Sequence, residues 1–188
     1  KQSTMKNIIK STALLLCSLA FLTACDDDRD NNPTIQTPTT FVLNTPSYAQ
    51  ANVDLATSES LAFSWSQPDY GFPALASYQI QVSPTNRWTK DIQAGEKDAT
   101  DQAVGDYKTF DTEFSLVKGS VAANEMAKAL QEIVRYEPNN VPASQDVYVR
   151  VRAAYAGDTI YSNAVQIKVL PYYMKLKDAA IDVWYLIG

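Results

Sequence analysis

Hydrophobic and polar residues alternate along much of the chain, and this pattern predicts short β-strands. The alternation is clearest in the segments 60–67, 77–83 and 146–154, where about every second residue is apolar. Successive side chains of a strand point to opposite faces, so each of these segments is expected to bury one face and expose the other. Further strands are predicted at 41–43, 108–110, 112–117 and 161–169, and residues 156–158, Ala-Gly-Asp, predict a turn before the last of these.

One segment has a helical period instead. Its apolar residues recur every three or four positions and form one stripe: Ala123, Met126, Ala127, Leu130, Ile133 and Val134. Ser120 stands before this stripe and can cap a helix over 121–134. The acidic segment 91–106 contains glycine and predicts a long loop. Together the elements predict an all-β fold, a β-sandwich over residues 38–170 with one helix inserted before the last two strands.

The beginning of the chain has the pattern of a targeting segment. From Met5 it carries Lys6 and Lys10 and then an apolar stretch over 13–22. A positive region followed by a short apolar one is typical of a secretory signal peptide, predicted here over 5–24. A membrane-spanning helix needs about 20 apolar residues, so this stretch is too short for one. A buried core helix is the alternative interpretation. Because four residues precede Met5, the start of the chain is expected to be early or internal to a longer reading frame.

The four residues 22–25, Leu-Thr-Ala-Cys, resemble a bacterial lipobox. The resemblance implies cleavage before Cys25 and attachment of lipid to its thiol, with 25–37 forming an acidic tether. The following Asp26, Asp27 and Asp28 resemble the surface-export signal of Bacteroidetes lipoproteins. In the proteobacterial sorting scheme, aspartate after the cysteine would instead favour retention in the inner membrane. Cys17 would leave with the signal peptide, so the mature domain is expected to lack both thiols and disulfides.

The composition excludes several kinds of chemistry. Histidine is absent and cysteine occurs twice, so no Ser-His-Asp or Cys-His catalytic group and no histidine-containing metal site can form. The net charge of −5 and the pI near 4.7 argue against nucleic-acid binding, which favours a basic surface. No segment places two carboxylates in a common cleft, so catalysis is not predicted. No cofactor is expected either.

Four strand segments resemble strands B, C, F and G of fibronectin type III domains. They are Leu61-x-Phe63-x-Trp65, Tyr78-x-Ile80-x-Val82, residues 149–153, and Tyr161-Ser162-Asn163. The resemblance implies an immunoglobulin-like, fibronectin type III-like β-sandwich. One departure is Val147, which stands where that family usually has a tyrosine, and another is the helix predicted before the last strands.

A second resemblance spans most of the chain. The acidic start after Cys25 and the segments 41–46, 63–71 and 183–188 resemble SusE-type proteins. Membership implies a non-catalytic, surface-exposed outer-membrane lipoprotein of Bacteroidetes that binds starch or a similar glycan beside an outer-membrane glycan transporter. It also implies that the domain over 38–170 is a spacer and that downstream modules bind the oligo- or polysaccharide. On this basis 171–179 is expected to be a linker and 180–188 the first strand of a truncated carbohydrate-binding module.

Three aromatic residues are candidate glycan contacts within the domain: Trp88, Tyr70 and Phe72. Each lies in a predicted loop, where its ring can form an exposed platform or pack over the end of the sandwich. Trp65 alternates with core residues and is expected to be buried. Acidic residues of the predicted loop, which could hold calcium but match no known calcium-loop pattern, are Glu96, Asp98, Asp101 and Asp106.

Polar residues of three predicted strands would form one outward face if those strands are neighbours: Gln79, Gln81, Tyr148, Arg150, Arg152, Gln166 and Lys168. Such a face is either solvated or a docking surface. Two further functions therefore stay open. One is an adhesion or protein-interaction lipoprotein that uses the sandwich face directly, and the other is an accessory module of a cell-envelope enzyme.

Overall fold

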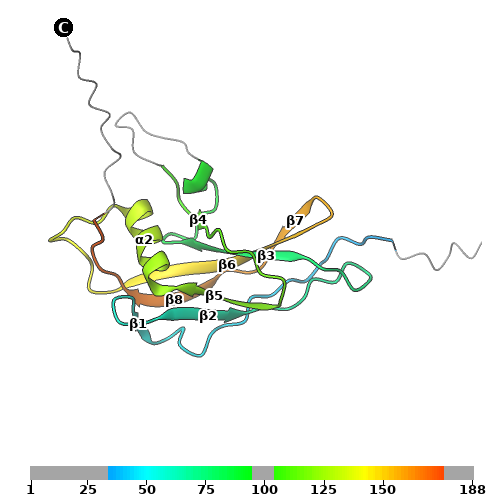
Figure 1. Cartoon of the computed structure of the whole chain (residues 1–188), viewed down its shortest axis with the longest axis horizontal. Coiled ribbons are helices and arrows are strands. Elements are labelled where there is room, and N and C mark those ends of the chain that lie inside the picture. Colours follow the sequence, from blue (N-terminus) through cyan, green and yellow to red (C-terminus); the bar gives the residue numbers. More distant parts are fainter. Residues whose placement is uncertain (1–33, 95–103, 176–188) are drawn as a thin grey trace, which may run out of the picture. The chain divides into compact units, whose positions relative to one another are not determined.

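The computed structural model describes residues 34–94 and 104–175, and the unit considered below begins at Gln36. It is mostly β, with one α-helix among the described residues (Figure 1). In chain order the elements are β1 (Asn52–Asp54), β2 (Ser60–Ser64), β3 (Ser77–Ser83), the 3₁₀ turn η2 (Ile92–Ala94), β4 (Lys108–Thr109), β5 (Lys118–Ala122), α2 (Ala123–Val134), β6 (Gln145–Tyr155), β7 (Asp158–Tyr161) and β8 (Val165–Leu170). The predicted all-β class is thereby confirmed.

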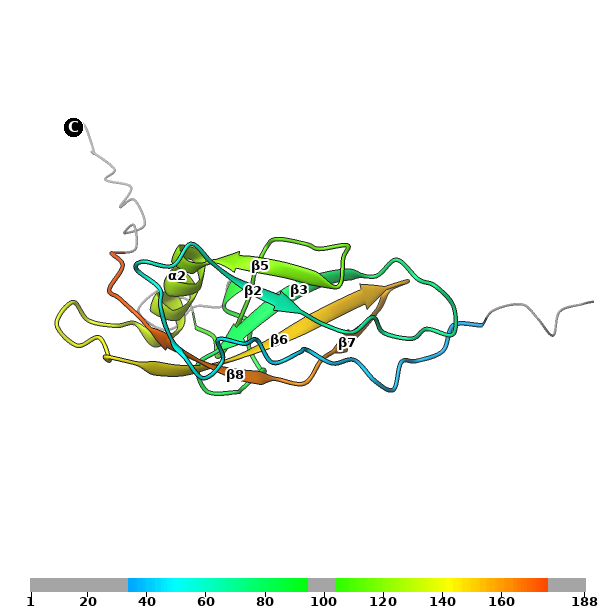
Figure 2. The ribbon, with the colours of Figure 1, turned by 90° about the horizontal axis from the view of Figure 1, so that it is seen from below.

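The larger sheet has the strand order β1-β8-β6-β3-β4, with β7 also paired to β6 (Figure 2). All its pairs are antiparallel except β1 with β8. The central pair is β3 with β6, in which Ile80 stands opposite Val151 and Val82 opposite Val149. These apolar residues are fully buried on one face, as the alternation predicted for 77–83 and 146–154.

The smaller sheet consists of β2 and β5, paired antiparallel with Phe63 opposite Gly119. The predicted strand at 41–43 runs beside β2 but makes only a bridge between Leu43 and Trp65. Its backbone contacts continue on either side, where Asn44 N–H donates to the Ser64 carbonyl and Ser66 N–H to that of Val42. The bridge places this segment at the outer edge of β2.

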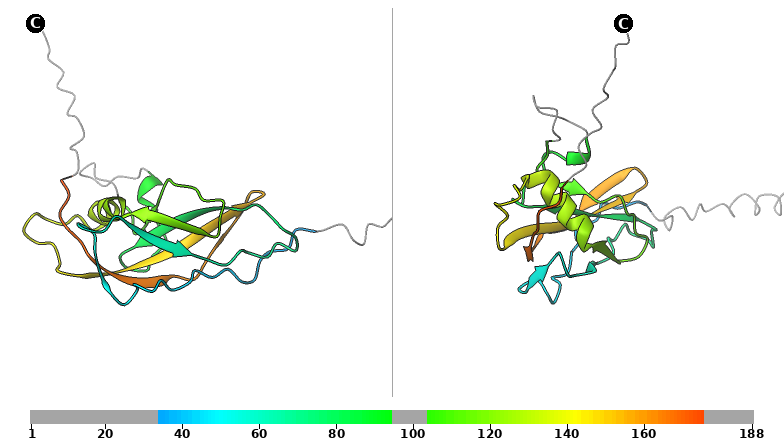
Figure 3. Two further views of the ribbon diagram at one scale, coloured as in Figure 1. Left: turned by 60° about the horizontal axis from the view of Figure 1, so that its bottom comes forward. Right: turned by 60° about the vertical axis from the view of Figure 1, so that its left-hand side comes forward.

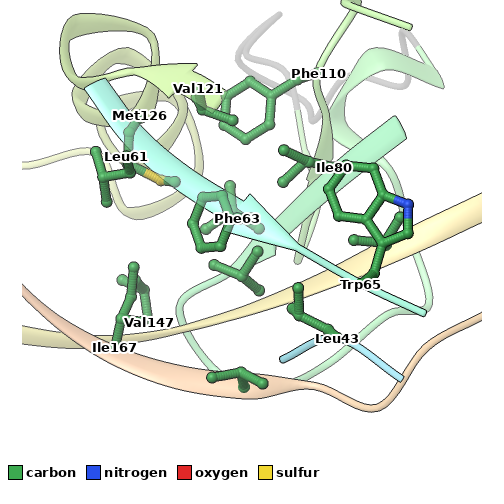
Figure 4. Close-up of a cluster of buried hydrophobic side chains, with 14 of the residues drawn as sticks. Leu43, Leu61, Phe63, Trp65, Ile80, Phe110, Val121, Met126, Val147 and Ile167 are labelled. Carbon is green, nitrogen blue, oxygen red and sulfur yellow. The ribbon is translucent and has the colours of Figure 1, made fainter. Parts of the chain in front are cut away.

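The core lies between the two sheets, with α2 near one end of β5 (Figure 3). Side chains from both sheets gather there, among them Leu61 and Phe63 of β2, Ile80 of β3 and Ile167 of β8 (Figure 4). Trp65 is 3% exposed, so the prediction that it belongs to the core is confirmed. Helix α2 follows β5 directly and contacts β2, β3 and β5.

The predicted start of the helix was wrong. Ser120 does not cap it, because residues 118–122 form β5 and pair with β2. The N-cap is Ala122, whose backbone is extended and whose side chain makes no capping bond. The helix ends at Val134, and the C-cap Arg135 adopts a left-handed conformation while its N–H donates to the Gln131 carbonyl. Strand pairing across the sheet therefore outweighed the local capping signal.

The predicted helical stripe is only partly buried. Ala123, Met126, Ala127 and Leu130 lie in the core, while Val134 at the C-terminal end is 39% exposed. Ala129 and Gln131 are buried as well. The buried face of the helix is therefore wider than the predicted stripe, and in the last turn it no longer includes Val134. Gln131 is satisfied there because its side-chain amide donates to the Tyr136 carbonyl at 2.9 Å.

Two other strand predictions were also wrong. Residues 112–117 form no strand, only a bridge from Phe114 to Tyr78, and the strand lies further along at 118–122. The predicted strand at 161–169 is interrupted, giving β7 before residue 162 and β8 after residue 164. Three strands rather than two therefore follow the helix. The turn predicted at 156–158 is confirmed, since Ala156 and Gly157 both adopt positive φ in a tight hairpin.

The residues between β7 and β8 connect the larger sheet to the 41–43 segment, which lies beside β2. The Ser162 hydroxyl accepts the Val151 N–H at 2.9 Å, continuing the ladder of β6 across the break. The Asn163 side chain accepts the Leu43 N–H at 2.9 Å and donates to the Leu43 carbonyl at 3.2 Å. Because an amide side chain matches a peptide group, Asn163 links the 41–43 segment to the larger sheet.

We expect Gly119→Ala to destabilise the domain. A β-carbon at Gly119 would lie 2.6 Å from the ring of Phe114. That ring packs edge-on against Trp65, and the Phe114 backbone is bonded to Tyr78 in both directions, so it cannot easily retreat. Overpacking of this kind costs about 1–3 kcal/mol of unfolding free energy. Urea denaturation followed by circular dichroism measures it. Ser120→Ala, at an exposed neighbouring position, should change the value by less than about 0.5 kcal/mol.

Candidate functional site

The polar face predicted for the larger sheet is assembled in the structure. Gln81 stands opposite Arg150, Gln79 opposite Arg152 and Tyr148 opposite Gln166. Because these positions alternate with buried valines and isoleucines, they share the face turned away from the core. The β6–β7 hairpin adds Tyr161, which stands opposite Arg152.

Arg150 occupies the centre of an aromatic cluster on this face. Its guanidinium carbon lies 4.2 Å from the ring centroid of Trp88 and 4.1 Å from that of Tyr161. Tyr107 lies further away, with its centroid at 5.6 Å. Stacked contacts between arginine and aromatic rings contribute about 0.5–2 kcal/mol each, depending on solvent exposure. Trp88, Tyr107, Arg150, Arg152 and Tyr161 are called the aromatic–arginine face below.

Neutral amide groups hold both arginines in position. Arg150 Nε donates to Gln81 Oε1 at 2.7 Å, and Arg152 Nη1 donates to Gln79 Oε1 at 2.7 Å. The two glutamines are themselves anchored. Gln81 donates to the Thr109 hydroxyl at 2.8 Å and Gln79 to the Phe110 carbonyl at 3.2 Å. This second set of bonds fixes the orientation of each amide and therefore of each guanidinium.

Burial affects the charge of Arg150. Desolvation lowers the pKa of its guanidinium, and the phenols of Tyr161 and Tyr107 and the carboxylate of Asp106 oppose that shift. An arginine stays protonated at neutral pH in any case. The aromatic–arginine face therefore carries a partly desolvated positive charge.

Asp106 is the one member of the predicted acidic set that the structure describes; Glu96, Asp98 and Asp101 lie outside the described residues. Its carboxylate accepts the backbone N–H groups of Thr89 and Lys90, each at 3.0 Å, and the Thr89 hydroxyl. Burial alone would raise the pKa of Asp106, but these bonds and the charge of Arg87 bring it below its ordinary value. Among the described residues no acidic cluster suited to a metal ion is found.

The three aromatic residues predicted as candidate glycan contacts pack against other side chains of the domain. Tyr70 is only 3% exposed and its ring lies 4.9 Å from that of Tyr155, so it is a core residue rather than a platform. Phe72 is half-buried and packs edge-on against the same tyrosine. Trp88 is also half-buried, with Arg150 over its ring and its Nε1 donating to Asn86 Oδ1 at 3.0 Å. Only Trp88 thus belongs to a polar–aromatic cluster.

Sequence reasoning missed Tyr107 and Tyr161 as members of this cluster. Tyr107 directly precedes the very short strand β4, where no alternation can be read. Tyr161 was placed in a single strand reaching 169, which hid the β6–β7 hairpin. The turn predicted at 156–158 carried the missing signal. A two-residue hairpin there brings Tyr161 back beside Arg152.

The smaller sheet carries an open, mostly apolar groove of about 540 Å³. Its lining comes from β2, β5 and the neighbouring loops: Asn44, Pro46, Ala62, Phe63, Ser64, Phe114, Leu116, Lys118, Gly119 and Ser120. Its charged group is Lys118, and its polar edge includes Asn44, which donates to the Ser64 hydroxyl at 3.1 Å. The groove therefore lies on the smaller sheet, whereas the aromatic–arginine face belongs to the larger one.

The targeting residues lie outside the described residues. These are the lipidation candidate Cys25 and the export candidates Asp26, Asp27 and Asp28. Within the described ranges no helix is long and apolar enough to cross a membrane.

The chain was compared with models of known protein families. The model of a family described as SusE outer membrane protein matches residues 27–152. The matched region starts two residues after Cys25 and reaches into β6, so it includes the smaller sheet, part of the larger sheet and both Arg150 and Arg152, while β7 and β8 lie beyond it.

Proposed function

The chain belongs to the SusE outer membrane protein family, and from this premise we propose that it is a non-catalytic surface lipoprotein of a starch- or glycan-utilisation system. In this proposal residues 38–170 are a spacer close to the membrane, 171–179 are a linker, and 180–188 begin a carbohydrate-binding module. The glycan, a starch-like oligo- or polysaccharide, is bound by such downstream modules. An outer-membrane glycan transporter is the proposed partner complex.

The spacer role is supported by the packing of the three candidate glycan-binding rings against other residues of the domain. Glycan sites commonly stack a sugar on an exposed aromatic ring. Tyr70 and Phe72 pack against Tyr155, and Trp88 packs against Arg150. Their packing energy therefore stabilises the domain itself, which suits a rigid support for modules elsewhere in the protein.

The fold proposed for this spacer is an immunoglobulin-like, fibronectin type III-like sandwich. Two observations support it. The second and fifth strands pair in one sheet, while β3, β6 and β8 pair in the other. The 41–43 segment lies beside β2, as the first strand of such a sandwich does beside the second. Helix α2, inserted between β5 and β6, is then an elaboration particular to this domain.

The proposed anchor is lipid on Cys25 after removal of a signal peptide over 5–24, with Asp26–Asp28 directing export to the cell surface. Apolar burial supplies about 0.8 kcal/mol per methylene, so an anchor of two or more acyl chains holds a protein at a membrane. The tether over 25–37 would separate the bilayer from the first residues of the domain. The cell-surface outer membrane is the proposed location.

An adhesion or protein-interaction role for the sandwich face is the second candidate. The observation that favours it is the aromatic–arginine face, whose residue types are those enriched at protein interfaces. A spacer alone does not need them.

Affinity electrophoresis in starch gels tests the spacer role. The 188-residue chain and the protein of the complete reading frame are run side by side, with bovine serum albumin as the unretarded standard. We expect retardation only of the longer protein. Retardation of the 188-residue chain would contradict the spacer role, and its Trp88→Ala variant would then show whether that ring is responsible. Absence of binding by either protein, across starch and other glycans, would contradict the glycan function.

A further inference from the structure

We propose that the aromatic–arginine face docks a different protein through a cluster of carboxylates on that protein's surface. This inference rests on the second candidate function above and deepens it, because it names the chemistry of the partner that the face would bind. It stands on the contacts of Arg150 and Arg152 and on the character of the surrounding surface.

The first observation is a charge imbalance at the centre of the larger sheet. The chain has 21 acidic residues against 16 basic ones. Even so, neither Arg150 nor Arg152 forms an ion pair with any carboxylate among the described residues. Each is bonded to a neutral glutamine instead. Neutral acceptors satisfy the hydrogen-bonding geometry, so within the described ranges both guanidinium groups lack a carboxylate in direct contact, although the charge of Asp106 acts on Arg150.

The second observation is the orientation of Arg150. The rings of Trp88 and Tyr161 lie about 4 Å from its guanidinium carbon, and Nε is bonded to Gln81. No acceptor among the described residues bonds either of its terminal nitrogens. A planar guanidinium held in one orientation is suited to bidentate binding of a carboxylate. Much of the entropy cost of ordering it has already been met by folding.

The third observation is the shape and composition of the surroundings. On this face Tyr161 is 46% exposed and Trp88, Arg150 and Arg152 are half-buried, whereas the groove of about 540 Å³ lies on the smaller sheet. A sugar generally needs a concave site or an uncovered aromatic ring, whereas the ring faces turned to Arg150 are covered by it. Tryptophan, tyrosine and arginine grouped on an open surface are instead typical of the residues that dominate protein–protein affinity. A protein partner therefore fits better than a glycan.

The partner is not expected to be a second copy of this chain bound through the same face. In a two-fold symmetric dimer each patch meets itself. The arginines of both copies would then approach one another without carboxylates between them, which is unfavourable. The complementary surface must be acidic, as charge complementarity requires for fast and specific association.

Photocrosslinking in the bacterium that encodes the chain tests the proposal. Benzoylphenylalanine replaces Gln166, an exposed residue opposite Tyr148 on the same face, or Leu116 at the groove of the smaller sheet. We expect Gln166 to give one dominant adduct with another protein, crosslinked within a peptide rich in aspartate or glutamate. Leu116 should not give that adduct.

Charge reversal provides the decisive comparison. Arg150→Glu with Arg152→Glu should reduce the Gln166 adduct at least about tenfold. Lys118→Glu with Lys128→Glu changes the net charge equally on other elements and should leave the adduct unchanged. If the first variant fails to fold by circular dichroism, Arg152→Glu alone keeps the Arg150 stack and should still reduce the adduct severalfold. The adduct should also weaken as salt rises from 50 to 500 mM, because exposed charge interactions are screened.

Several outcomes would overturn the proposal. They are an adduct with a second copy of the chain, an adduct with polysaccharide, an equal yield from Leu116, insensitivity to charge reversal, or no adduct at Gln166. None of them bears on whether the complete protein is retarded by starch. Failure of docking is therefore distinguishable from failure of the glycan function.

Discussion

Trp65→Ala should lower the free energy of unfolding by about 3–5 kcal/mol, the usual cost of truncating a buried tryptophan. Trp65 is 3% exposed and its ring contacts two others, with centroid distances of 5.4 Å to Tyr78 and 6.0 Å to Phe114. Tyr78 of β3 and Phe114 form a backbone bridge with each other, and Trp65 bridges to Leu43. Removing the indole would leave a cavity where both sheets and the 41–43 segment meet.

Urea denaturation followed by far-ultraviolet circular dichroism measures this loss without depending on tryptophan fluorescence. Since domains of this size are stable by roughly 5–15 kcal/mol, the variant should be severely weakened or unfolded. Leu75→Ala is the matched control. Leu75 is 92% exposed, so its truncation should change stability by less than about 0.5 kcal/mol. Equal losses at the two positions would show that Trp65 is not a core residue in solution.

Trp65→Phe separates the packing of the ring from its polar atom. Among the described residues, Trp65 Nε1 is the buried side-chain nitrogen or oxygen without a hydrogen-bond partner. An unsatisfied buried donor costs about 1–3 kcal/mol. Phenylalanine gives up part of the packing but also removes that donor. The variant should therefore lie within about 1 kcal/mol of the original protein, well above Trp65→Ala.

The central strands could be predicted because their signal is local and repeated. In 77–83 and 146–154 a period of two places valine and isoleucine on one face and glutamine and arginine on the other, and pairing of β3 with β6 keeps both sets together. The resemblance to SusE-type proteins was likewise carried by short local segments, and the family match over 27–152 confirms it.

The features that were predicted wrongly or missed depend on contacts between residues distant in sequence. Ser120 is a good capping residue for the helix that follows, but its neighbours pair with β2 about 60 residues earlier. Tyr70 stands between turn residues, and its burial depends on Tyr155 at the far end of β6. The stack on Arg150 joins rings from three separate segments. No local pattern encodes such meetings, because the topology brings the residues together.

The two faces of the larger sheet therefore have separate physical roles. The inner face holds the valines and isoleucines that stabilise the domain, and a substitution there acts through packing. The outer face holds Arg150 and Arg152 on neutral amides, and a substitution there acts mainly through charge. Loss of stability and loss of docking should accordingly be separable by variants, as expected for a spacer that also presents a recognition surface.

Cys25→Ala should abolish membrane anchoring, the largest effect expected on location. The proposed lipid can be attached only through the thiol of Cys25, and cleavage would have to precede that residue. A single acyl chain binds a membrane marginally and reversibly, so stable anchoring needs at least two, each gaining about 0.8 kcal/mol per methylene. Labelling cells with radioactive palmitate should mark the original protein and not the variant.

Protease treatment of intact cells should degrade the original protein and spare the variant, which would not reach the surface. Cys17→Ala is the matched control, since it removes the other cysteine of the chain from within the predicted signal peptide and leaves 22–25 unchanged. It should keep both the label and the surface exposure. Palmitate incorporation into the Cys25 variant would show that this cysteine is not the lipidated residue. Loss of label from the Cys17 variant as well would point to a defect in export, because Cys17 lies within the apolar stretch 13–22 and Cys25 does not.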